Sequence, residues 1–321
     1  MIFERKIKEM FRSRLYTRAE DTGAVFYFSH EDFPGLTVTP YSFPAAAGHR
    51  LSGYFYDFGD PIPGRVVVFD HGMGGGHRSY MQEIVMLARR GFRVFAYDHT
   101  GCMTSEGETT GGFGQSLSDL DAALAALGAD EALAGVKFSV VGHSWGGFAA
   151  LNIAALHPEV THIVAMAGFR SVEAIVRSTF RGLLAPYRRA ILKMEAESHP
   201  EMMEHDAVSS LCHTDAKVLI LHSEDDGTVS AHHHFDAMER ALSWRENIRF
   251  LRLTGRGHNP NYTEDAAAYL GEFLKALKAR IKAGGLADAE GHRAFLAGYD
   301  WYRMTAQDEA VWEEIYKTLE A

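Results

Sequence analysis

The feature that most constrains the fold is the alternation, after about residue 64, of short apolar runs with segments of helical character. Apolar runs that lack polar alternation are typical of strands buried on both faces, as in a parallel sheet. Strands that alternate with helices predict a doubly wound α/β domain. The predicted strands are residues 66–69, 94–97, 138–141, 163–166, 218–221 and 248–251, and the predicted helices are about 78–90, 116–128, 146–157, 231–244 and 263–284.

The N-terminal extension of about residues 1–60 has a different pattern. Apolar residues recur at helical spacing within residues 3–15 and predict a short amphipathic helix packed on the body. Residues 25–28, 36–39 and 51–55 are β-prone runs separated by Gly and Pro, which predict short strands.

Two later segments interrupt the alternation. The segment of about residues 170–216 is longer than a single crossover helix requires. Its helical patterning predicts a helical cap insertion. Residues 286–321 are helix-prone and rich in aromatic side chains, which predicts a helical extension packed on the main domain. A dimer surface or a wall of the active site are the alternatives for this extension. We therefore expect one domain over residues 1–285, including the N-terminal extension and the cap, followed by the extension.

Charge and cysteine content exclude several classes of protein. A net charge of −10 over 321 residues argues against a nucleic-acid partner, which requires a basic face. Two cysteines cannot build a disulfide framework, so we expect a reducing, cytoplasmic environment. Charged residues near the N-terminus interrupt any hydrophobic segment of a secretory signal. The sequence has no run of 18 apolar residues, so we expect no membrane span.

The main chemical motif is Gly-His-Ser-Trp-Gly at residues 142–146. This pattern alone is weak, but it follows an apolar run and precedes an Ala-rich helical segment. A strand that enters a helix through so tight a turn lifts the central hydroxyl above the sheet edge, and glycines flank it because side chains there would collide. We expect Ser144 to be a nucleophile; the alternative is a purely structural Gly-rich turn.

A serine hydroxyl needs a base and an orienting acid, and in such folds these follow later strands, the acid first. Asp226 follows the predicted strand 218–221 and is the expected acid, with Asp225 as the alternative and Glu224 as the least favoured. His258 lies in a Gly-rich loop after the predicted strand 248–251 and is the expected base.

An oxyanion requires two placed N–H donors. One is expected from Trp145, directly after Ser144 and at a helix N-terminus, where the helix dipole helps. The other is expected from Met73 in the Gly-rich loop 71–77. A phosphate-binding loop is the alternative for 71–77, but neither a G-K-[ST] ending nor dinucleotide-binding spacing follows.

In these ordered motifs the sequence resembles the α/β-hydrolase superfamily over about residues 64–283, and its layout is similar to capped esterases, lipases and serine aminopeptidase-like hydrolases. The resemblance implies the α/β-hydrolase fold, with a mostly parallel eight-stranded sheet flanked by helices. It also implies a Ser-Asp-His triad and hydrolysis without a cofactor. The loop 98–107 departs from the family pattern, because Thr100 replaces an Arg and Met103 a Gly.

Other nucleophiles and ligands are less favoured. Cys102 has no placed base, and the three adjacent histidines 232–234 point in different directions on a helix, so we expect no metal site.

The expected reaction is hydrolysis of a carboxylic ester of a small, hydrophobic substrate. Amide cleavage as in a serine aminopeptidase, thioester cleavage, acyl transfer and a non-catalytic ligand-binding role are the alternatives. A small-molecule acyl substrate is the expected partner, and a homodimer is left open. The residues expected to contact substrate are His77, His143, Phe169 and Arg170. Arg170 could recognise a carboxylate or form an ion pair within the cap.

Overall fold

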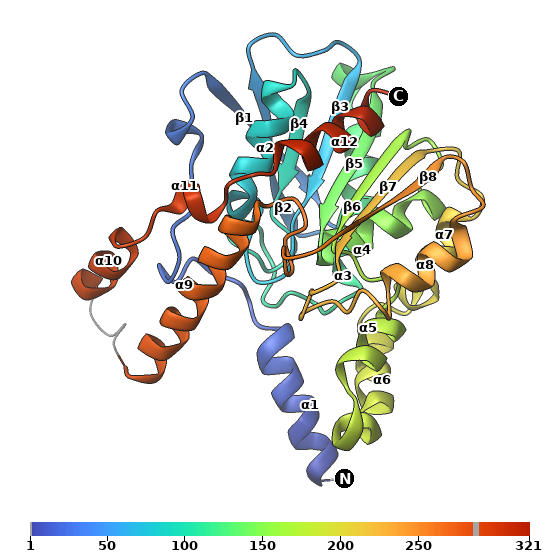
Figure 1. Cartoon of the computed structure of the whole chain (residues 1–321). Coiled ribbons are helices and arrows are strands. Elements are labelled where there is room, and N and C mark those ends of the chain that lie inside the picture. Colours follow the sequence, from blue (N-terminus) through green and yellow to red (C-terminus); the bar gives the residue numbers. More distant parts are fainter. Residues whose placement is uncertain (1, 285–288) are drawn as a thin grey trace.

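The computed structural model describes residues 2–284 and 289–321, and its centre is one eight-stranded sheet in the order β1-β2-β4-β3-β5-β6-β7-β8 (Figure 1). β2 is antiparallel to both β1 and β4, and every other neighbouring pair is parallel. The mostly parallel sheet agrees with the apolar runs of the sequence. The strands are β1 Leu36–Pro44, β2 Arg50–Phe58, β3 Arg65–Asp70, β4 Arg93–Tyr97, β5 Lys137–His143, β6 His162–Met166, β7 Lys217–Ser223 and β8 Ile248–Leu253.

One predicted strand was wrong: residues 25–28 are irregular backbone. Their apolar character is explained by packing against the C-terminal part of the chain. The Phe26 ring centroid lies 5.8 Å from that of Trp301, and the Phe28 centroid lies 4.8 Å from that of Tyr302. The apolar side chains of this segment therefore serve aromatic packing, without a neighbouring strand to pair with.

Both faces of the sheet are covered because side chains alternate along each strand. In β3, Val66 and Val68 belong to the core beneath one layer of helices, and Val67 and Phe69 belong to the core beneath the other. The first layer contains α3 Gln115–Ala129, α4 Trp145–Asn152 and α8 Phe235–Leu242; the second contains α2 Met81–Arg89 and α12 Glu309–Leu319.

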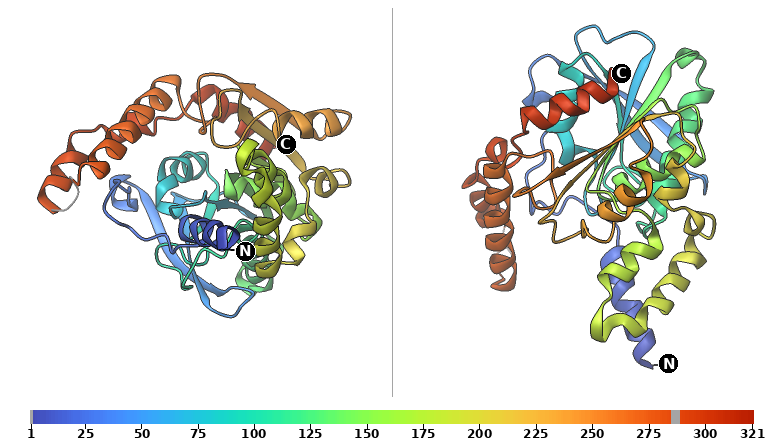
Figure 2. Two further views of the ribbon diagram at one scale, coloured as in Figure 1. Left: turned by 90° about the horizontal axis from the view of Figure 1, so that it is seen from below. Right: turned by 45° about the vertical axis from the view of Figure 1, so that its right-hand side comes forward.

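A cap of short helices lies between β6 and β7 and packs beside the N-terminal helix (Figures 1 and 2). Buried Phe11 joins the two segments, since its ring centroid lies 5.7 Å from that of Phe180 in the cap. The N-terminal helix therefore forms one body with the cap. The elements are α1 Ile2–Leu15, α5 Val172–Thr179, α6 Arg188–Ser198 and α7 Ala207–Leu211, with the short 3-10 helices η5 Gly182–Tyr187 and η6 Glu201–Glu204.

The C-terminal segment packs in two places. Helices α10 Ala289–Ala297 and α11 Trp301–Met304 share a small aromatic core with α9 Glu264–Lys282, and the views agree that α9 and α10 lie side by side (Figures 1 and 2). Farther along, α12 lies on the sheet, where the side chain of Trp312 is fully buried. The predicted boundary at 285–286 lies outside the described residues. Within the described ranges, no helix combines the length and apolar character needed to cross a membrane.

Candidate active site

Ser144 occupies the sharp turn between β5 and α4, and its backbone is strained, with φ of 56°. The flanking glycines are required sterically. A Cβ on Gly142 would lie 2.2 Å from the carbonyl oxygen of Gly146, and a Cβ on Gly146 would lie 2.1 Å from the carbonyl oxygen of Asp70. The turn is held by the backbone N–H of Ser144, which donates to the Met166 carbonyl at 2.8 Å. The local sequence thus projects the hydroxyl from the carboxyl edge of the sheet.

Ser144, His258 and Asp226 form one hydrogen-bonded chain. Nε2 of His258 lies 2.8 Å from the Ser144 hydroxyl oxygen, and Nδ1 lies 2.8 Å from Oδ2 of Asp226. A carboxylate can only accept, so Nδ1 carries the proton and Nε2 is left as the acceptor for the serine hydroxyl. This is the protonation state in which an imidazole can act as a base toward a hydroxyl.

The Asp226 carboxylate is fixed from several sides. Its Oδ1 accepts from the backbone N–H groups of Thr228 and Val229, at 2.8 and 2.9 Å. Burial raises the pKa of Asp226, but interactions with His222 and His258 outweigh it and hold the pKa well below its ordinary value. The group is therefore ionised at neutral pH, and a carboxylate in this position is able to stabilise a protonated imidazole.

Asp225 has a different role from its neighbour. Its carboxylate accepts from the backbone N–H groups of Gly255 and Gly257, at 2.9 and 3.2 Å, and from the Ser223 hydroxyl. It thus shapes the loop that carries His258, whereas Asp226 contacts the imidazole itself.

A second set of hydrogen bonds lies behind the serine. Burial, followed by the proximity of His258, lowers the pKa of His143 to about 3, so its imidazole is neutral. Its Nε2 donates to the backbone carbonyl of His258 at 2.7 Å, and its Nδ1 accepts from the Tyr80 hydroxyl at 2.8 Å. The Tyr80 oxygen in turn accepts from the backbone N–H of Gly72 at 3.1 Å. Three loops of the site are therefore connected through Tyr80 and His143.

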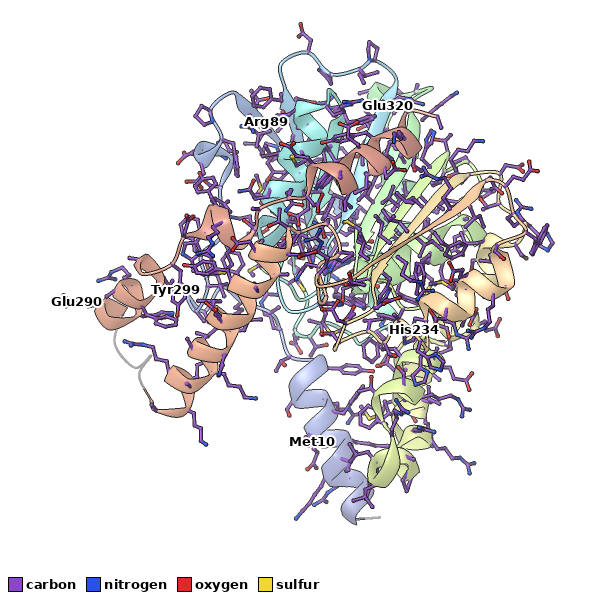
Figure 3. All side chains as sticks on the ribbon, in the orientation of Figure 1. Met10, Arg89, His234, Glu290, Tyr299 and Glu320 are labelled. Carbon is purple, nitrogen blue, oxygen red and sulfur yellow. The ribbon has the colours of Figure 1, made fainter. Side chains whose placement is uncertain are left out.

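A cavity of about 660 Å³ opens over Ser144, and we call it the Ser144 cavity. Its lining is apolar except for the hydroxyls of Ser144, Thr179 and Thr228 and the imidazole of His258. The walls come from the N-terminal helix, the cap and the segments that follow each strand from β3 to β8 (Met10 is labelled in Figure 3). The lining residues are Met10, Phe11, Met73, Gly74, Phe113, Ser144, Trp145, Phe169, Ile175, Thr179, Phe180, Leu184, Thr228, Val229 and His258.

The two expected oxyanion residues, Met73 and Trp145, both line this cavity. Trp145 is the first residue of α4, and the first N–H groups of a helix have no acceptor within the helix. The Trp145 ring is buried and its Nε1 donates to the Phe113 carbonyl at 2.8 Å, which fixes the residue beside Ser144.

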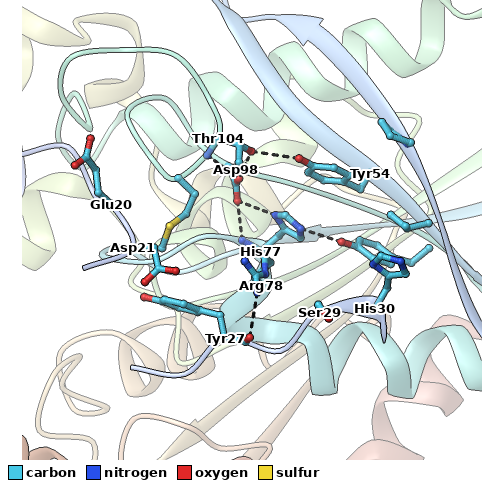
Figure 4. A pocket seen from close by; sticks show the side chains of 14 residues that line it. Glu20, Asp21, Tyr27, Ser29, His30, Tyr54, His77, Arg78, Asp98 and Thr104 are labelled. Carbon is cyan, nitrogen blue, oxygen red and sulfur yellow. Dashed lines mark hydrogen bonds and ion pairs between the residues drawn. The ribbon is translucent and has the colours of Figure 1, made fainter. Parts of the chain in front are cut away.

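Of the four expected substrate contacts, only Phe169 lines the Ser144 cavity. His143 is buried behind the serine, as described above. His77 lies in a separate pocket next to Tyr56, where its Nδ1 bonds to Asp98 at 2.7 Å (Figure 4). Arg170 lines a different pocket and forms an ion pair with Asp206 at 3.3 Å, which was its alternative interpretation.

The less favoured sites have structural explanations. Cys102 is buried, and burial raises the pKa of its thiol well above the ordinary value, so it is a poor nucleophile. His234 is buried and bonds to Ser178 and to the backbone N–H of Arg170. Within the part of the chain that the structure describes, no group of three or more His, Cys, Asp or Glu side chains is arranged to hold a metal ion.

The strand order, the antiparallel β2 and the serine turn after β5 define an α/β hydrolase. Comparison with known proteins agrees and is more specific. Residues 61–244 match the model of the family described as serine aminopeptidase, S33, and the chain belongs to this family of hydrolases.

A curated relative is similar in sequence over part of the chain, and two solved structures are similar in fold. A Yersinia enterocolitica protein named "Putative carbamate hydrolase RutD" is 31% identical over 129 residues, which cover 40% of this chain and 45% of that protein. The chain therefore spans less than half the length of this curated relative. An esterase of Pyrococcus furiosus superposes with a TM-score of 0.58 at 19% identity, covering 78% of this chain and 95% of the esterase. An esterase domain from Rhodothermus marinus superposes with a TM-score of 0.50 at 20% identity, covering 76% of this chain and 98% of the esterase domain.

Proposed function

We propose that this protein is a serine hydrolase that cleaves a carboxylic ester of a small hydrophobic substrate through an acyl-enzyme. The observation that carries the proposal is the chain Ser144–His258–Asp226, with two 2.8 Å hydrogen bonds and its serine end in an apolar cavity. A hydroxyl is a weak nucleophile unless a base accepts its proton, and this arrangement supplies the base and its orienting acid.

The proposed reaction has two halves. His258 accepts the Ser144 proton as the oxygen attacks the ester carbonyl, and the backbone N–H groups of Met73 and Trp145 stabilise the oxyanion. The protonated His258 then donates to the leaving alkoxide, which departs as the alcohol. In the second half, His258 deprotonates water, water attacks the acyl-enzyme, and the acid is released with Ser144 restored. Asp226 stays ionised throughout and stabilises the imidazolium.

The cavity favours a neutral acyl group over an aminopeptidase substrate. Recognition of a free α-ammonium group requires a carboxylate or several acceptors near the scissile bond. Among the described residues that line the Ser144 cavity there is no Asp or Glu, and the walls are Phe, Met, Ile, Leu and Val side chains with few hydroxyls. Such walls stabilise an apolar acyl chain by about 0.8 kcal/mol for each buried CH₂ group.

Covalent labelling tests the chemistry directly. A fluorophosphonate probe should label the wild-type protein at one site, and Ser144→Ala should remove the label. Ser139→Ala, in the same strand and away from the turn, is the matched control and should still be labelled. An unlabelled wild-type protein would contradict the enzymatic proposal and favour a ligand-binding role.

A substrate panel tests the ester preference. p-Nitrophenyl esters of increasing acyl length should be hydrolysed, with kcat/KM rising by up to about fourfold for each added CH₂ until the cavity is filled. Aminoacyl anilides and aryl carbamates belong in the same panel, because of the family description and the name of the Yersinia relative. Turnover of anilides or carbamates in the absence of ester turnover would overturn the ester assignment.

A further inference from the structure

A second hollow, of about 320 Å³, lies in the cap and contains an unusual concentration of positive charge. We call it the arginine pocket. It is separate from the Ser144 cavity, since the two have no lining residue in common. Its lining residues are Arg170, Ala174, Arg177, Ser178, Arg181, Arg188 and His233.

Four guanidinium groups in one small hollow are unexpected in a chain with a net charge of −10. Like charges repel, so such a cluster is stable only if counter-charges or solvent compensate it. Two of the four have acidic partners: Arg170 pairs with Asp206 at 3.3 Å, and Arg177 pairs with Glu173 at 2.6 Å.

The other two guanidiniums lack such compensation. Among the described residues, Arg181 and Arg188 have no carboxylate within ion-pair distance, and Arg188 donates from Nε to the backbone carbonyl of Phe180 at 2.5 Å. Arg170 also keeps an unused donor, because its Nε is buried and has no acceptor in the described part of the chain. The pocket therefore presents two uncompensated positive charges and a buried N–H without an acceptor.

Neighbouring histidines do not neutralise the pocket. Burial, followed by the charge of Arg181, lowers the pKa of His233. His234 lies behind the pocket, and its Nε2 donates to Ser178, whose hydroxyl donates to the Ile175 carbonyl (His234 is labelled in Figure 3). Neither histidine therefore supplies a negative charge to Arg181 or Arg188.

We propose that the arginine pocket binds the phosphate group of a small molecule. A phosphate monoester carries close to two negative charges at neutral pH and has three terminal oxygens. Its charge matches the two uncompensated guanidiniums, and its oxygens can accept from donors on several sides, a geometry for which Arg is well suited. A carboxylate carries a single charge and two oxygens, so it satisfies this set of donors less completely.

The pocket lies close to the Ser144 cavity without opening into it. Helix α5 contributes to both, with Ile175 and Thr179 facing the Ser144 cavity and Ala174 and Ser178 facing the arginine pocket. The proposed phosphate site does not depend on the proposed ester hydrolysis, and it is testable by binding alone.

Isothermal titration calorimetry with inorganic phosphate, at constant ionic strength, tests the site. Phosphate should bind the wild-type protein, glycerol 3-phosphate should compete with it, and acetate should bind at least about fivefold more weakly. Arg181→Ala should weaken phosphate binding at least about tenfold, and Arg188→Ala should do the same. Arg189→Ala is the matched control, because Arg189 is exposed and next to Arg188 but does not line the pocket. The phosphate affinity of this variant should stay within about twofold of the wild-type value.

A loss of phosphate binding can be distinguished from a loss of folding. Among the described residues the Arg181 side chain forms no hydrogen bond or ion pair, so its substitution should leave the thermal midpoint in phosphate-free buffer unchanged. A wild-type protein that binds no phosphate at 10 mM, as an order-of-magnitude upper limit for a useful site, would overturn the proposal. Equal phosphate affinity of Arg181→Ala and the wild type, or acetate affinity equal to that of phosphate, would overturn it as well.

Discussion

Nε2 of His143 donates a 2.7 Å hydrogen bond to the backbone carbonyl of His258, so the residue before the serine directly holds the residue that faces the serine hydroxyl. The bond joins the turn after β5 to the loop after β8. Tyr80 completes the arrangement, because its hydroxyl donates to Nδ1 of His143 and accepts from the N–H of Gly72. The relative positions of Ser144 and His258 are thus fixed by a neutral imidazole.

Removing this connection should slow the reaction while leaving substrate binding nearly unchanged. We expect His143→Ala to lower kcat by about 10- to 100-fold with less than about threefold change in KM, because a small displacement of His258 disturbs proton transfer. Tyr80→Phe should lower kcat by about tenfold. His143→Gln keeps a side-chain donor and should recover part of the lost rate. A change in KM at constant kcat would show instead that His143 acts on substrate binding.

The two adjacent aspartates should behave very differently. Asp226→Asn should lower kcat by roughly 1,000-fold, since an amide can neither stabilise the imidazolium nor keep the required tautomer. Asp225→Asn is the matched control and should cost less than about tenfold, because Asp225 contacts the loop backbone and not the imidazole. Equal losses in the two variants, measured with one p-nitrophenyl ester, would remove Asp226 from the proposed triad.

Glu83 should make the free energy of unfolding depend on pH. Its side chain is buried, with Oε1 accepting from Asn261 at 2.9 Å and Oε2 without a partner in the described structure. Burial raises its pKa from 4.5 to about 7. Below pH 4.5 both the folded and unfolded chains hold this proton. Between pH 4.5 and 7 only the unfolded chain loses it, so this group's contribution to stability falls as pH rises and is lowest above pH 7.

Glu83→Gln removes the ionisation and keeps a similar shape. The variant should be more stable than the wild type at pH 8, by up to about 3 kcal/mol, and the difference should disappear near pH 4. Urea unfolding at both pH values measures this. Glu246→Gln, at an exposed position, is the control and should show no such pH dependence. A destabilised Glu83→Gln at pH 8 would show that the carboxylate is ionised and satisfied in the folded protein.

The C-terminal helix should be required for stability. Trp312 is fully buried in α12 against the sheet, and its Nε1 donates to Gln307 at 2.8 Å. Trp312→Ala should lower the free energy of unfolding by about 3–5 kcal/mol, because it leaves a large cavity. Trp244→Ala is the control, since Trp244 is 67% exposed, and should change stability by less than about 1 kcal/mol. A small effect at Trp312 would mean that residues 309–319 pack only loosely on the domain.

The sheet was predictable because burial on both faces leaves a pattern in each strand. The runs 66–69, 138–141 and 218–221 contain almost no polar residue, and each lies in a strand. The local motif was equally informative, because the strained turn at Ser144 requires glycine on both sides. The proximity of Asp226 and His258 to Ser144 was predictable because all three follow parallel strands whose carboxyl ends lie at one edge of the sheet.

Contacts between distant segments could not be predicted in this way. Helical periodicity identified residues 3–15 as amphipathic, but it does not say which surface the helix covers, and Met10 and Phe11 turn out to line the Ser144 cavity. His77 was expected at the site because of its loop, yet the chain turns it away toward Tyr56 and Asp98. The role of Tyr80 could not be predicted from the sequence, because no sequence pattern indicates that its hydroxyl bonds to His143 and Gly72.

Part of the wall of the Ser144 cavity is supplied by α1 and by the cap, segments that contribute no strand to the sheet. Substitutions in these two segments can therefore accumulate during evolution without weakening strand pairing or displacing the serine turn. Selection for a new substrate would act first on residues 10–11 and on the stretch 175–184. A hydrolase built in this way can diversify its substrates rapidly while its reaction chemistry stays constant.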